Sequence, residues 1–426
     1  MKQKKAVVIV LMVLLALPVF AERTAMPPLD MPTTASDGYG GHHVAYTDNV
    51  FSLFVNPAAM IQVQQWSFFT LASTFFSPET LANSYNPIVS MIGGDLDALG
   101  ELADTLSGQN KQVALGVDIR ELPFSFAWVT NGFGFGLWNR TFLNANVKGS
   151  FLEVDIFGDV MLPVGFAFKI VDLNGHSLDA GVALKPFLRV KAYGKEKITA
   201  LVGDTSDLVD KLNVPLIMGL TADLGFMYRW DIGLRAGLTF DDVFSFGKVV
   251  RDFVGNDDNS YYVPFTMNLG LAYELKISKF GFTLMLDWHD IANAFKQDNY
   301  LNRNSSLDLS LGFQFSMFDM FKLRIGLNEM LPSFGFGVNL GPVEIDFAYY
   351  GKEFGSEPGQ FSNAMMGFSV SIRPGAKKKN WPWARRAIFG DRHDDYDYEA
   401  TPNPPVPPTP PKFEEGSMQE EIWNAN

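Results

Sequence analysis

The run that decides the fold is Ser306-Leu307-Asp308-Leu309-Ser310-Leu311-Gly312-Phe313-Gln314-Phe315-Ser316. Every second residue in it is apolar, and the residues between are small, polar or acidic. Successive side chains of a β-strand point to opposite faces, so this period of two predicts a strand with one apolar face. The same alternation recurs from Phe265 to Lys276 and from Asn363 to Ile372.

Alternation of this kind fits two architectures. A soluble β-sandwich turns its apolar faces inward, whereas a membrane barrel turns them outward to the lipid. Several predicted segments run for ten residues or more, which is long for a soluble strand and right for a tilted membrane strand. We therefore predict an all-β fold, a transmembrane antiparallel β-barrel of about fourteen strands.

Turn lengths support the barrel and give it a direction. Short links are expected after the even-numbered strands, among them Asn131-Gly132, residues 171–177 and Ser278-Lys279. Longer links, 77–112, 193–215, 241–261 and 289–304, follow odd-numbered strands, although a link of five residues (329–333) after strand 11 departs from this rule. Short turns on one side and long loops on the other are typical of outer-membrane barrels.

The second strand carries an irregularity. Its apolar phase changes around Leu122-Pro123. Proline cannot donate a hydrogen bond to the neighbouring strand, and one extra residue reverses the facing of all that follow. A bulge is therefore expected at this point.

The N-terminus predicts export. Lys2, Lys4 and Lys5 precede an apolar run from Ala6 to Phe20, and Val19-Phe20-Ala21 offers a cleavage site. This is the layout of a signal peptide over residues 1–21, the alternative being an uncleaved anchor. The chain has no cysteine, so neither a lipid anchor on cysteine nor a disulfide framework is expected.

Composition narrows the possible partners. The formal charge of −13 argues against nucleic acid, because phosphate binding requires a basic surface. Aromatic residues make up 14% of the chain, and Phe and Gly number 38 each. Beyond the signal peptide no stretch approaches the roughly 20 apolar residues of a membrane helix. Apolar residues spread singly along the chain suit strands with one face in lipid.

The segment before the first strand carries the most specific motif. Ala45 and Asp48 precede Asn56-Pro57-Ala58, and Trp66 opens the strand. This region resembles the N-terminus of the FadL-type long-chain fatty acid transporters of the outer membrane. The resemblance implies a fourteen-stranded barrel that is closed by an N-terminal hatch and takes up hydrophobic molecules. After the signal peptide, the chain is expected to consist of a plug (22–63), a barrel (64–373) and a tail (374–426).

The plug contains the predicted gate, formed by Asp48, Asn56, Pro57 and Ala58. Pro57 fixes its own φ and holds Asn56 extended, while Asn56 can bond to nearby backbone groups. An ordinary turn before a strand is the alternative interpretation. The apolar residues around Phe51 and Phe54 suit an oily ligand.

Charged residues also fall on the inward face of the predicted strands. Arg189, Lys191 and Arg235 are candidates for holding a substrate carboxylate, because a buried carboxylate needs a partner. The alternative is a network of paired charges in the lumen. With Phe51 and Phe54, these three residues make up the predicted substrate site.

Catalysis finds little support in the sequence. His42-His43 lacks further metal ligands, and His289-Asp290 has no nucleophile beside it. No catalytic residue, metal or cofactor is therefore predicted.

The tail is proline-rich and charged, and it is expected in the periplasm as a disordered segment that either binds a periplasmic partner or binds nothing. The expected function is uptake of fatty acids or other lipids across the outer membrane, in contact with its lipids. A partner-binding scaffold for secretion or surface attachment and a general porin are the alternatives.

Overall fold

The computed structural model of the protein describes residues 23–67, 69–76, 113–121, 125–148, 151–173, 175–197, 214–253, 259–291, 303–318, 320–360 and 362–373. The expected signal peptide, the tail and the link 77–112 lie outside these residues. Contacts divide the chain into two units, residues 1–379 and 380–426, and all the described residues belong to the first.

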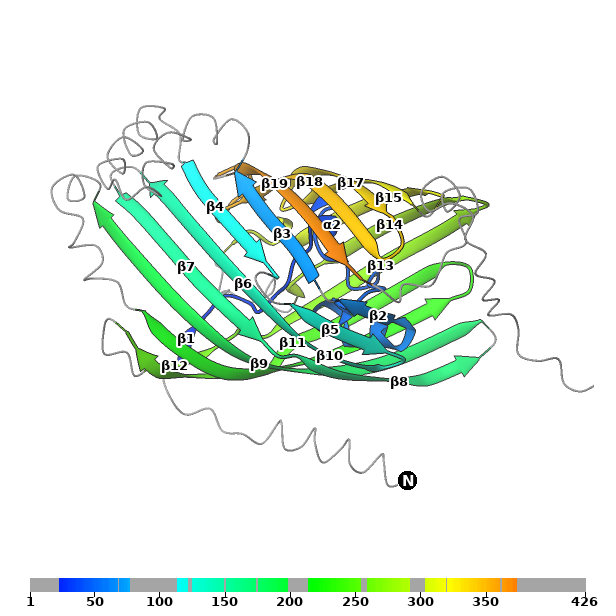
Figure 1. The fold of residues 1–426 in the computed structure, drawn as a ribbon, viewed down its shortest axis with the longest axis horizontal. Helices are drawn as coiled ribbons and strands as arrows, with labels where there is room; N and C mark the ends of the chain where they lie inside the picture. The colour runs from blue at the N-terminus through cyan, green and yellow to red at the C-terminus, as the bar shows by residue number, and fades with distance from the viewer. Residues whose placement is uncertain are drawn as a thin grey trace, which may run out of the picture. The chain divides into compact units, whose positions relative to one another are not determined.

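One antiparallel sheet forms the wall of the barrel (Figure 1). Its strands, in chain order, are β2 (Gln64–Ser67) with β3 (Phe69–Phe76), β4 (Val113–Arg120) with β5 (Phe126–Thr130), β6 (Phe133–Lys148), β7 (Phe151–Met161) with β8 (Val164–Leu173), β9 (His176–Lys197), β10 (Pro215–Trp230), β11 (Leu234–Asp252), β13 (Thr266–Ile277), β14 (Phe280–Trp288), β15 (Leu309–Met317), β16 (Phe321–Asn328), β17 (Leu331–Asn339), β18 (Val343–Glu353) and β19 (Ser362–Ile372).

The sheet closes because its last strand pairs with its first. β19 runs antiparallel to β3 from Met365 opposite Phe76 to Ile372 opposite Phe69. Three pairs of segments (β2 with β3, β4 with β5, β7 with β8) are each two parts of one strand. Within the described residues the wall therefore has fourteen full strands, and the predicted fold class is confirmed. Two short segments, β1 (Arg23–Ala25) and β12 (Ser260–Tyr262), pair in parallel beside it.

Proline accounts for one of the divided strands. The register of β9 continues across the break, from Met161 opposite Phe187 to Val164 opposite Leu184. Pro163 lies between β7 and β8 and has no N–H to donate to the ladder. The wall is therefore continuous here, although one hydrogen bond is missing.

The outer face of the wall is apolar. On β13 the exposed side chains include Leu269, Leu271, Tyr273 and Leu275, and the residues between these four face inward. Other strands repeat this pattern, for example Phe166 and Phe168 on β8 or Leu284 and Leu286 on β14. A monomeric soluble protein rarely exposes an apolar patch above a few hundred Å². An apolar belt on a closed sheet is the surface that a bilayer requires.

No helix among the described residues is both long enough and apolar enough to cross a membrane.

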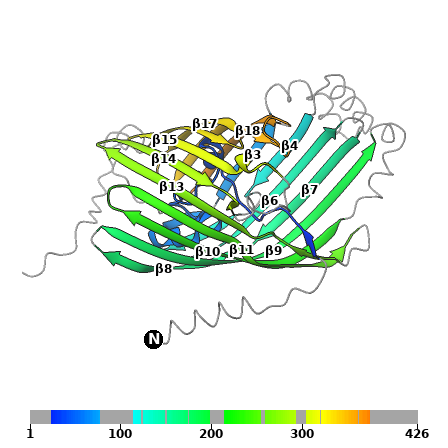
Figure 2. The ribbon, with the colours of Figure 1, turned by 180° about the vertical axis from the view of Figure 1, so that it is seen from behind.

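The N-terminal segment lies inside the ring of strands in both views (Figures 1 and 2). It holds α2 (Thr34–Gly38), α3 (Ser52–Val55) and the 3-10 helix η1 (Pro57–Gln62). Thr33 begins α2 with a capping box shared with Ser36, in which each side chain accepts from the other residue's backbone N–H. We call residues 23–63 the plug.

Three expectations about the connections are corrected. β11 continues to Asp252, and β12 follows, so the predicted link 241–261 is largely strand. The predicted seven-residue link 171–177 shrinks to a tight turn at Gly175, because β8 ends at Leu173 and β9 begins at His176. The five-residue link after β16 is only Glu329-Met330, both with positive φ, as a two-residue hairpin turn requires.

The alternating run 306–316 was expected to be strand throughout, but its first residues are helical. Ser305–Asp308 forms a second 3-10 helix, η2, which is capped by Asn304, and the strand begins at Leu309. Leu307 is buried rather than lipid-facing. Asn304 accepts a hydrogen bond from the N–H of Ser306, which favours a helical turn over an extended strand here.

The hairpin turn expected after the second strand is found. Asn131 and Gly132 have positive φ, as a type I′ turn needs. Arg120 of β4 lies opposite Arg140 of β6, whereas Phe126 of β5 lies opposite Leu137, so the register against β6 shifts between the two segments. Residues 122–124, where the proline bulge was predicted, lie outside the described ranges.

We expect Leu271→Arg to destabilise the folded barrel by roughly 2–4 kcal/mol, because Leu271 lies in the middle of β13 on the lipid-facing side. Ile277→Arg, at the end of the same strand next to a short turn, is the control and should cost about 0–1 kcal/mol. Denaturant unfolding in lipid vesicles, followed by tryptophan fluorescence, measures both. Equal costs would contradict a membrane-spanning β13.

Candidate functional site at the contact between the plug and the barrel wall

Asn56 joins three parts of the molecule. Its Oδ1 accepts from the N–H of Ala58 at 3.1 Å, which caps η1. Its Nδ2 donates to the carbonyls of Val44 (2.9 Å) in the plug and Phe226 (3.1 Å) in β10. The residue is fully buried. One side chain therefore starts η1, connects two plug segments and holds both to the wall.

Wall glycines make room for this turn. Gly181 of β9 and Gly225 of β10 are opposite each other in register. A Cβ on Gly181 would lie 2.4 Å from the carbonyl carbon of Pro57 and 2.5 Å from the nitrogen of Ala58. A Cβ on Gly225 would lie 2.2 Å from Oδ1 of Asn56. The plug can approach the wall this closely only because these positions carry no side chain.

The same arrangement continues along the inner wall. Glycines on six further strands lie against the plug: Gly134, Gly165, Gly237, Gly312, Gly326 and Gly335. Some of these glycines face the backbone of the plug so closely that a Cβ would not fit. A Cβ on Gly326, for example, would lie 2.2 Å from the carbonyl carbon of Tyr39. Together with Gly181 and Gly225, these six residues make up a set of eight that we call the glycine seat. It explains why glycine is frequent on the inward faces of the strands.

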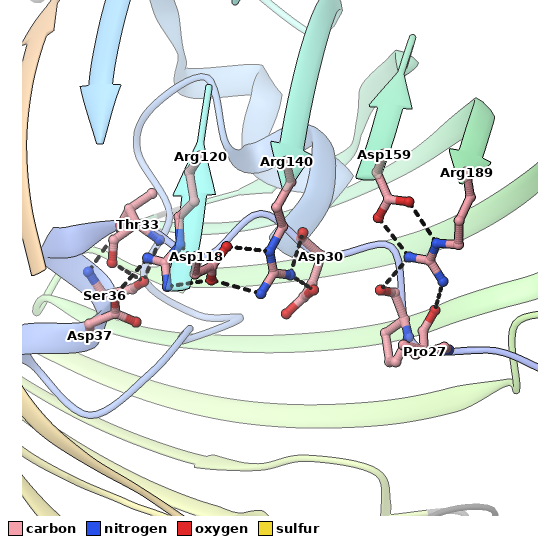
Figure 3. Close-up of polar contacts among 11 residues, drawn as sticks. Pro27, Asp30, Thr33, Ser36, Asp37, Asp118, Arg120, Arg140, Asp159 and Arg189 are labelled. Atoms are coloured by element: carbon pink, nitrogen blue, oxygen red, sulfur yellow. Dashed lines mark hydrogen bonds and ion pairs between the residues drawn. The ribbon is translucent and has the colours of Figure 1, made fainter. Parts of the chain in front are cut away.

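A row of charged residues holds the first part of the plug. Arg120 (β4), Arg140 (β6), Asp159 (β7) and Arg189 (β9) are opposite one another in successive registers, so they form one line across four strands. Figure 3 shows the three arginines directed toward the plug. We call these four residues the charged row.

Each arginine of the charged row contacts a different plug group. Arg120 bonds to the carboxylate of Asp37 at 2.6 Å, Arg140 bonds to that of Asp30, and Arg189 donates to the carbonyl of Pro27 at 2.6 Å (Figure 3).

Carboxylates on the wall pair with the arginines of the charged row. Asp118 of β4 accepts from both Arg120 and Arg140, at 2.9 Å. Asp159 accepts from Nε and Nη2 of Arg189, at 2.6 and 2.7 Å. Charges this deeply buried require such partners, since an unpaired one would cost several kcal/mol. The wall therefore presents arginines that are already oriented when the plug binds.

A second anchor lies beyond α2. Asp287 of β14 accepts from the N–H of Val44 at 2.7 Å and also bonds to Nδ1 of His43. Nε2 of His43 faces the carbonyl of Tyr39 at 3.2 Å. Both His43 and Asp287 are buried. His43 thus has a hydrogen-bonding role within the plug, where the sequence offered only a weak metal site, and the described residues contain no cluster suited to a metal.

The predicted gate residues lie partly at this contact. Asn56, Pro57 and Ala58 are buried on the glycine seat, whereas Asp48 is exposed. Phe51 and Phe54 are buried against Trp138 of β6, with ring centroids 6.3 and 4.9 Å away. The two phenylalanines therefore pack the plug against the wall.

The predicted cations differ in their surroundings. Arg189 belongs to the charged row, and its guanidinium also lies 4.9 Å from the ring of Phe157. Arg235 pairs with Glu274 at 2.5 Å and lies over the ring of Tyr46. Lys191 is half-buried next to Phe157 in register. The three do not form one cluster, and their role in substrate binding stays a prediction.

Sequence reasoning missed Asp30, Asp37, Arg120 and Arg140. Asp118 and Arg120 are two residues apart on a strand whose alternate residues are apolar, so their shared inward facing was readable. Their alignment with Arg140 and Arg189 depends on the register of four strands, which alternation alone does not set.

No family model matches the sequence, and no curated protein matches it. Similar solved structures include the CymD monoaromatic hydrocarbon channel, at 13% identity over 81% of this chain and 97% of that one, with a TM-score of 0.47. The Pseudomonas putida toluene transporter TodX matches at 11% identity over 83% and 100%, with a TM-score of 0.43. A Pseudomonas aeruginosa FadL homologue has the same identity, coverage and TM-score.

Gly181→Ala tests the glycine seat. The new methyl group would lie within 2.6 Å of the Pro57 backbone, which cannot rotate away, so we expect the plug to be displaced and channel conductance to rise. Gly158→Ala on β7 is the matched control, because nothing lies within 4 Å of its added Cβ. Conductance in planar bilayers measures the effect. If both variants stay closed, the seat does not position the plug.

Acid should loosen the plug through His42. Burial lowers the pKa of this imidazole from 6.5 to about 4. A displaced plug would bind the proton more readily, so the seated state keeps full stability above pH 6.5 and loses it as the pH falls toward 4. Asp37 acts in the opposite direction, because burial raises its pKa.

Comparing wild type with His42→Asn separates the two effects. Open probability measured between pH 7 and 4.5 should rise more steeply in the wild type than in the variant. Identical pH profiles of open probability would show that His42 does not control the seating of the plug.

Proposed function

We propose that this protein is an outer-membrane channel for the uptake of hydrophobic molecules such as long-chain fatty acids, and that the plug is its gate. The observation that carries the proposal is the plug itself, seated by close backbone contacts inside a closed barrel with an apolar exterior. The resemblance of residues 45–58 to the FadL-type transporters implies the same class of cargo.

The extent of the contact argues against a general porin. Plug residues contact β4, β6 and β9 through the charged row, and β8 to β11 through Asn56 and the glycine seat. They also contact β14 through Asp287 and β15 to β17 through the segment around Tyr39. A solute that passes through the lumen must therefore displace the plug.

The nature of the contact favours an apolar cargo. Val50, Leu53 and Met60 of the plug pack in one buried cluster with wall residues that include Val129 and Trp138. Displacing the plug separates these surfaces. A hydrocarbon chain covers such surfaces at lower free energy than water does. The gate thus opens more easily for a ligand that replaces the lost apolar contacts.

The plug is also held by contacts that can be broken. The chain has no cysteine, so no disulfide ties plug to wall. The polar anchors are hydrogen bonds and ion pairs at Asn56, Asp287 and the charged row. Hydrogen bonds of this kind contribute about 0.5–1.5 kcal/mol each, or about 1.5–3 kcal/mol when one partner is charged. A bound ligand can offset the loss of several of them.

We expect Asn56→Ala to open the channel. It removes the cap of η1 and leaves the carbonyls of Val44 and Phe226 without this donor, at a cost of about 1–3 kcal/mol to the seated plug. Since each 1.4 kcal/mol is a factor of ten, the displaced population should rise at least about fivefold.

Asn304→Ala is the matched control, because Asn304 also caps a 3-10 helix but lies away from the plug. Single-channel recording and uptake of a labelled fatty acid by cells measure both variants. A wild-type barrel with steady ionic conductance would indicate a porin and refute the proposal.

A further inference from the structure

We infer that Arg140 is the headgroup site for an amphipathic carboxylate, and that Asp30 of the plug occupies this site in the closed state and is replaced by the substrate. The inference rests on the proposed uptake function and specifies the ligand chemistry that opens the plug.

The plug partners of the charged row differ in exposure. The side chain of Asp37 is 9% exposed against Arg120, whereas that of Asp30 is 52% exposed although it bonds to the buried Arg140. An ion pair with one partner open to water is weakened, because water and salt compete for the exposed charge. Asp30 is therefore the plug carboxylate that an incoming anion can replace most easily.

Arg140 stays in place when Asp30 leaves. Its Nε and Nη2 donate to Asp118 at 2.9 Å, and only Nη1 faces Asp30. The buried Asp118 keeps the guanidinium oriented. The site for a carboxylate thus exists before the ligand arrives, and binding requires no reorientation of the arginine.

Aromatic rings border the site. Phe142 and Phe157 stack on each other with centroids 5.0 Å apart. The guanidinium of Arg140 lies 5.8 and 5.7 Å from the two centroids. The rings lie two residues from the charged row on β6 and β7, toward the end of the barrel that carries the long links 77–112 and 198–213. A hydrocarbon chain can pack on the rings while its carboxylate reaches Arg140.

Two lysines increase the positive charge around the rings. Nζ of Lys352, on β18, lies 5.3 Å from the centroid of Phe142. Lys191, on β9, is opposite Phe157 in register. Among the residues that the structure describes, neither lysine has a carboxylate within ion-pair distance. Both positive charges would attract an anionic headgroup toward the rings.

Electrostatics then favour an exchange of one carboxylate for another. Partial burial tends to raise the pKa of Asp30, but the positive charges of Arg140 and Lys352 outweigh it and hold the pKa below its usual range. Asp30 is therefore ionised at neutral pH. When a substrate carboxylate takes its place, the local charge is unchanged, whereas a neutral alcohol or ester would leave Arg140 short of an anion.

The test compares oleic acid with oleyl alcohol as ligands of the purified full-length protein. Asp30→Asn removes the competing charge, so the acid should bind up to about fivefold more tightly while the alcohol is unaffected. Lys352→Gln should weaken the acid severalfold and leave the alcohol unchanged. Asp172→Asn is the matched control, because Asp172 also forms an exposed ion pair, with Lys169, near the end of β8 and 13 residues after Asp159 of the charged row. Native mass spectrometry gives the bound fractions.

The outcomes separate the inference from the function on which it rests. If Asp30→Asn binds the acid no better than wild type, or tightens acid and alcohol equally, the carboxylate exchange is wrong while the uptake channel stands. If the wild type binds neither ligand and cells lacking the protein take up fatty acids normally, the proposed function itself fails.

Discussion

The pairing of β3 with β19 is the constraint on which the rest of the molecule depends. In a bilayer no water is available to bond to an unpaired strand edge, and each unsatisfied backbone group costs several kcal/mol. Closing the sheet removes both edges and at the same time creates an interior. The alternation of each strand then assigns its residues: Leu269 and Leu271 face lipid, whereas Gly270 between them faces the plug.

The closed interior sets a problem of fit that glycine solves. A wall of ordinary side chains would keep the plug backbone at a distance, whereas Gly181, Gly225 and Gly326 let it lie directly on the strands. Such close contacts bury the polar groups of both the plug and the wall, so each of these groups needs a hydrogen-bond partner. Asn56, Asp287 and the charged row provide these bonds. Tight packing and these hydrogen bonds hold the plug against the wall without a disulfide.

Much of the barrel was predictable because a lipid-facing strand leaves a strong pattern, and the fourteen strands follow from it. The errors arose where that pattern weakens. β11 beyond Asp241 pairs partly with the short β12, and Ser305–Asp308 is shaped by the cap of Asn304 rather than by alternation. Of the site, the Asn56-Pro57-Ala58 motif could be identified because it is local. The charged row could not, because Arg120, Arg140 and Arg189 come together only through the register of β4, β6, β7 and β9.

The central claim is that the plug must move for a molecule to pass, and a reversible crosslink tests it most directly. The chain has no cysteine, so Ala58→Cys with Met227→Cys places a unique pair in the buried cluster where η1 packs on β10. Uptake of a labelled fatty acid by cells carrying this variant is measured with the pair oxidised and again after reduction. The account predicts that oxidation reduces uptake to background and that reduction restores it. Undiminished uptake with the crosslink complete would contradict a moving plug.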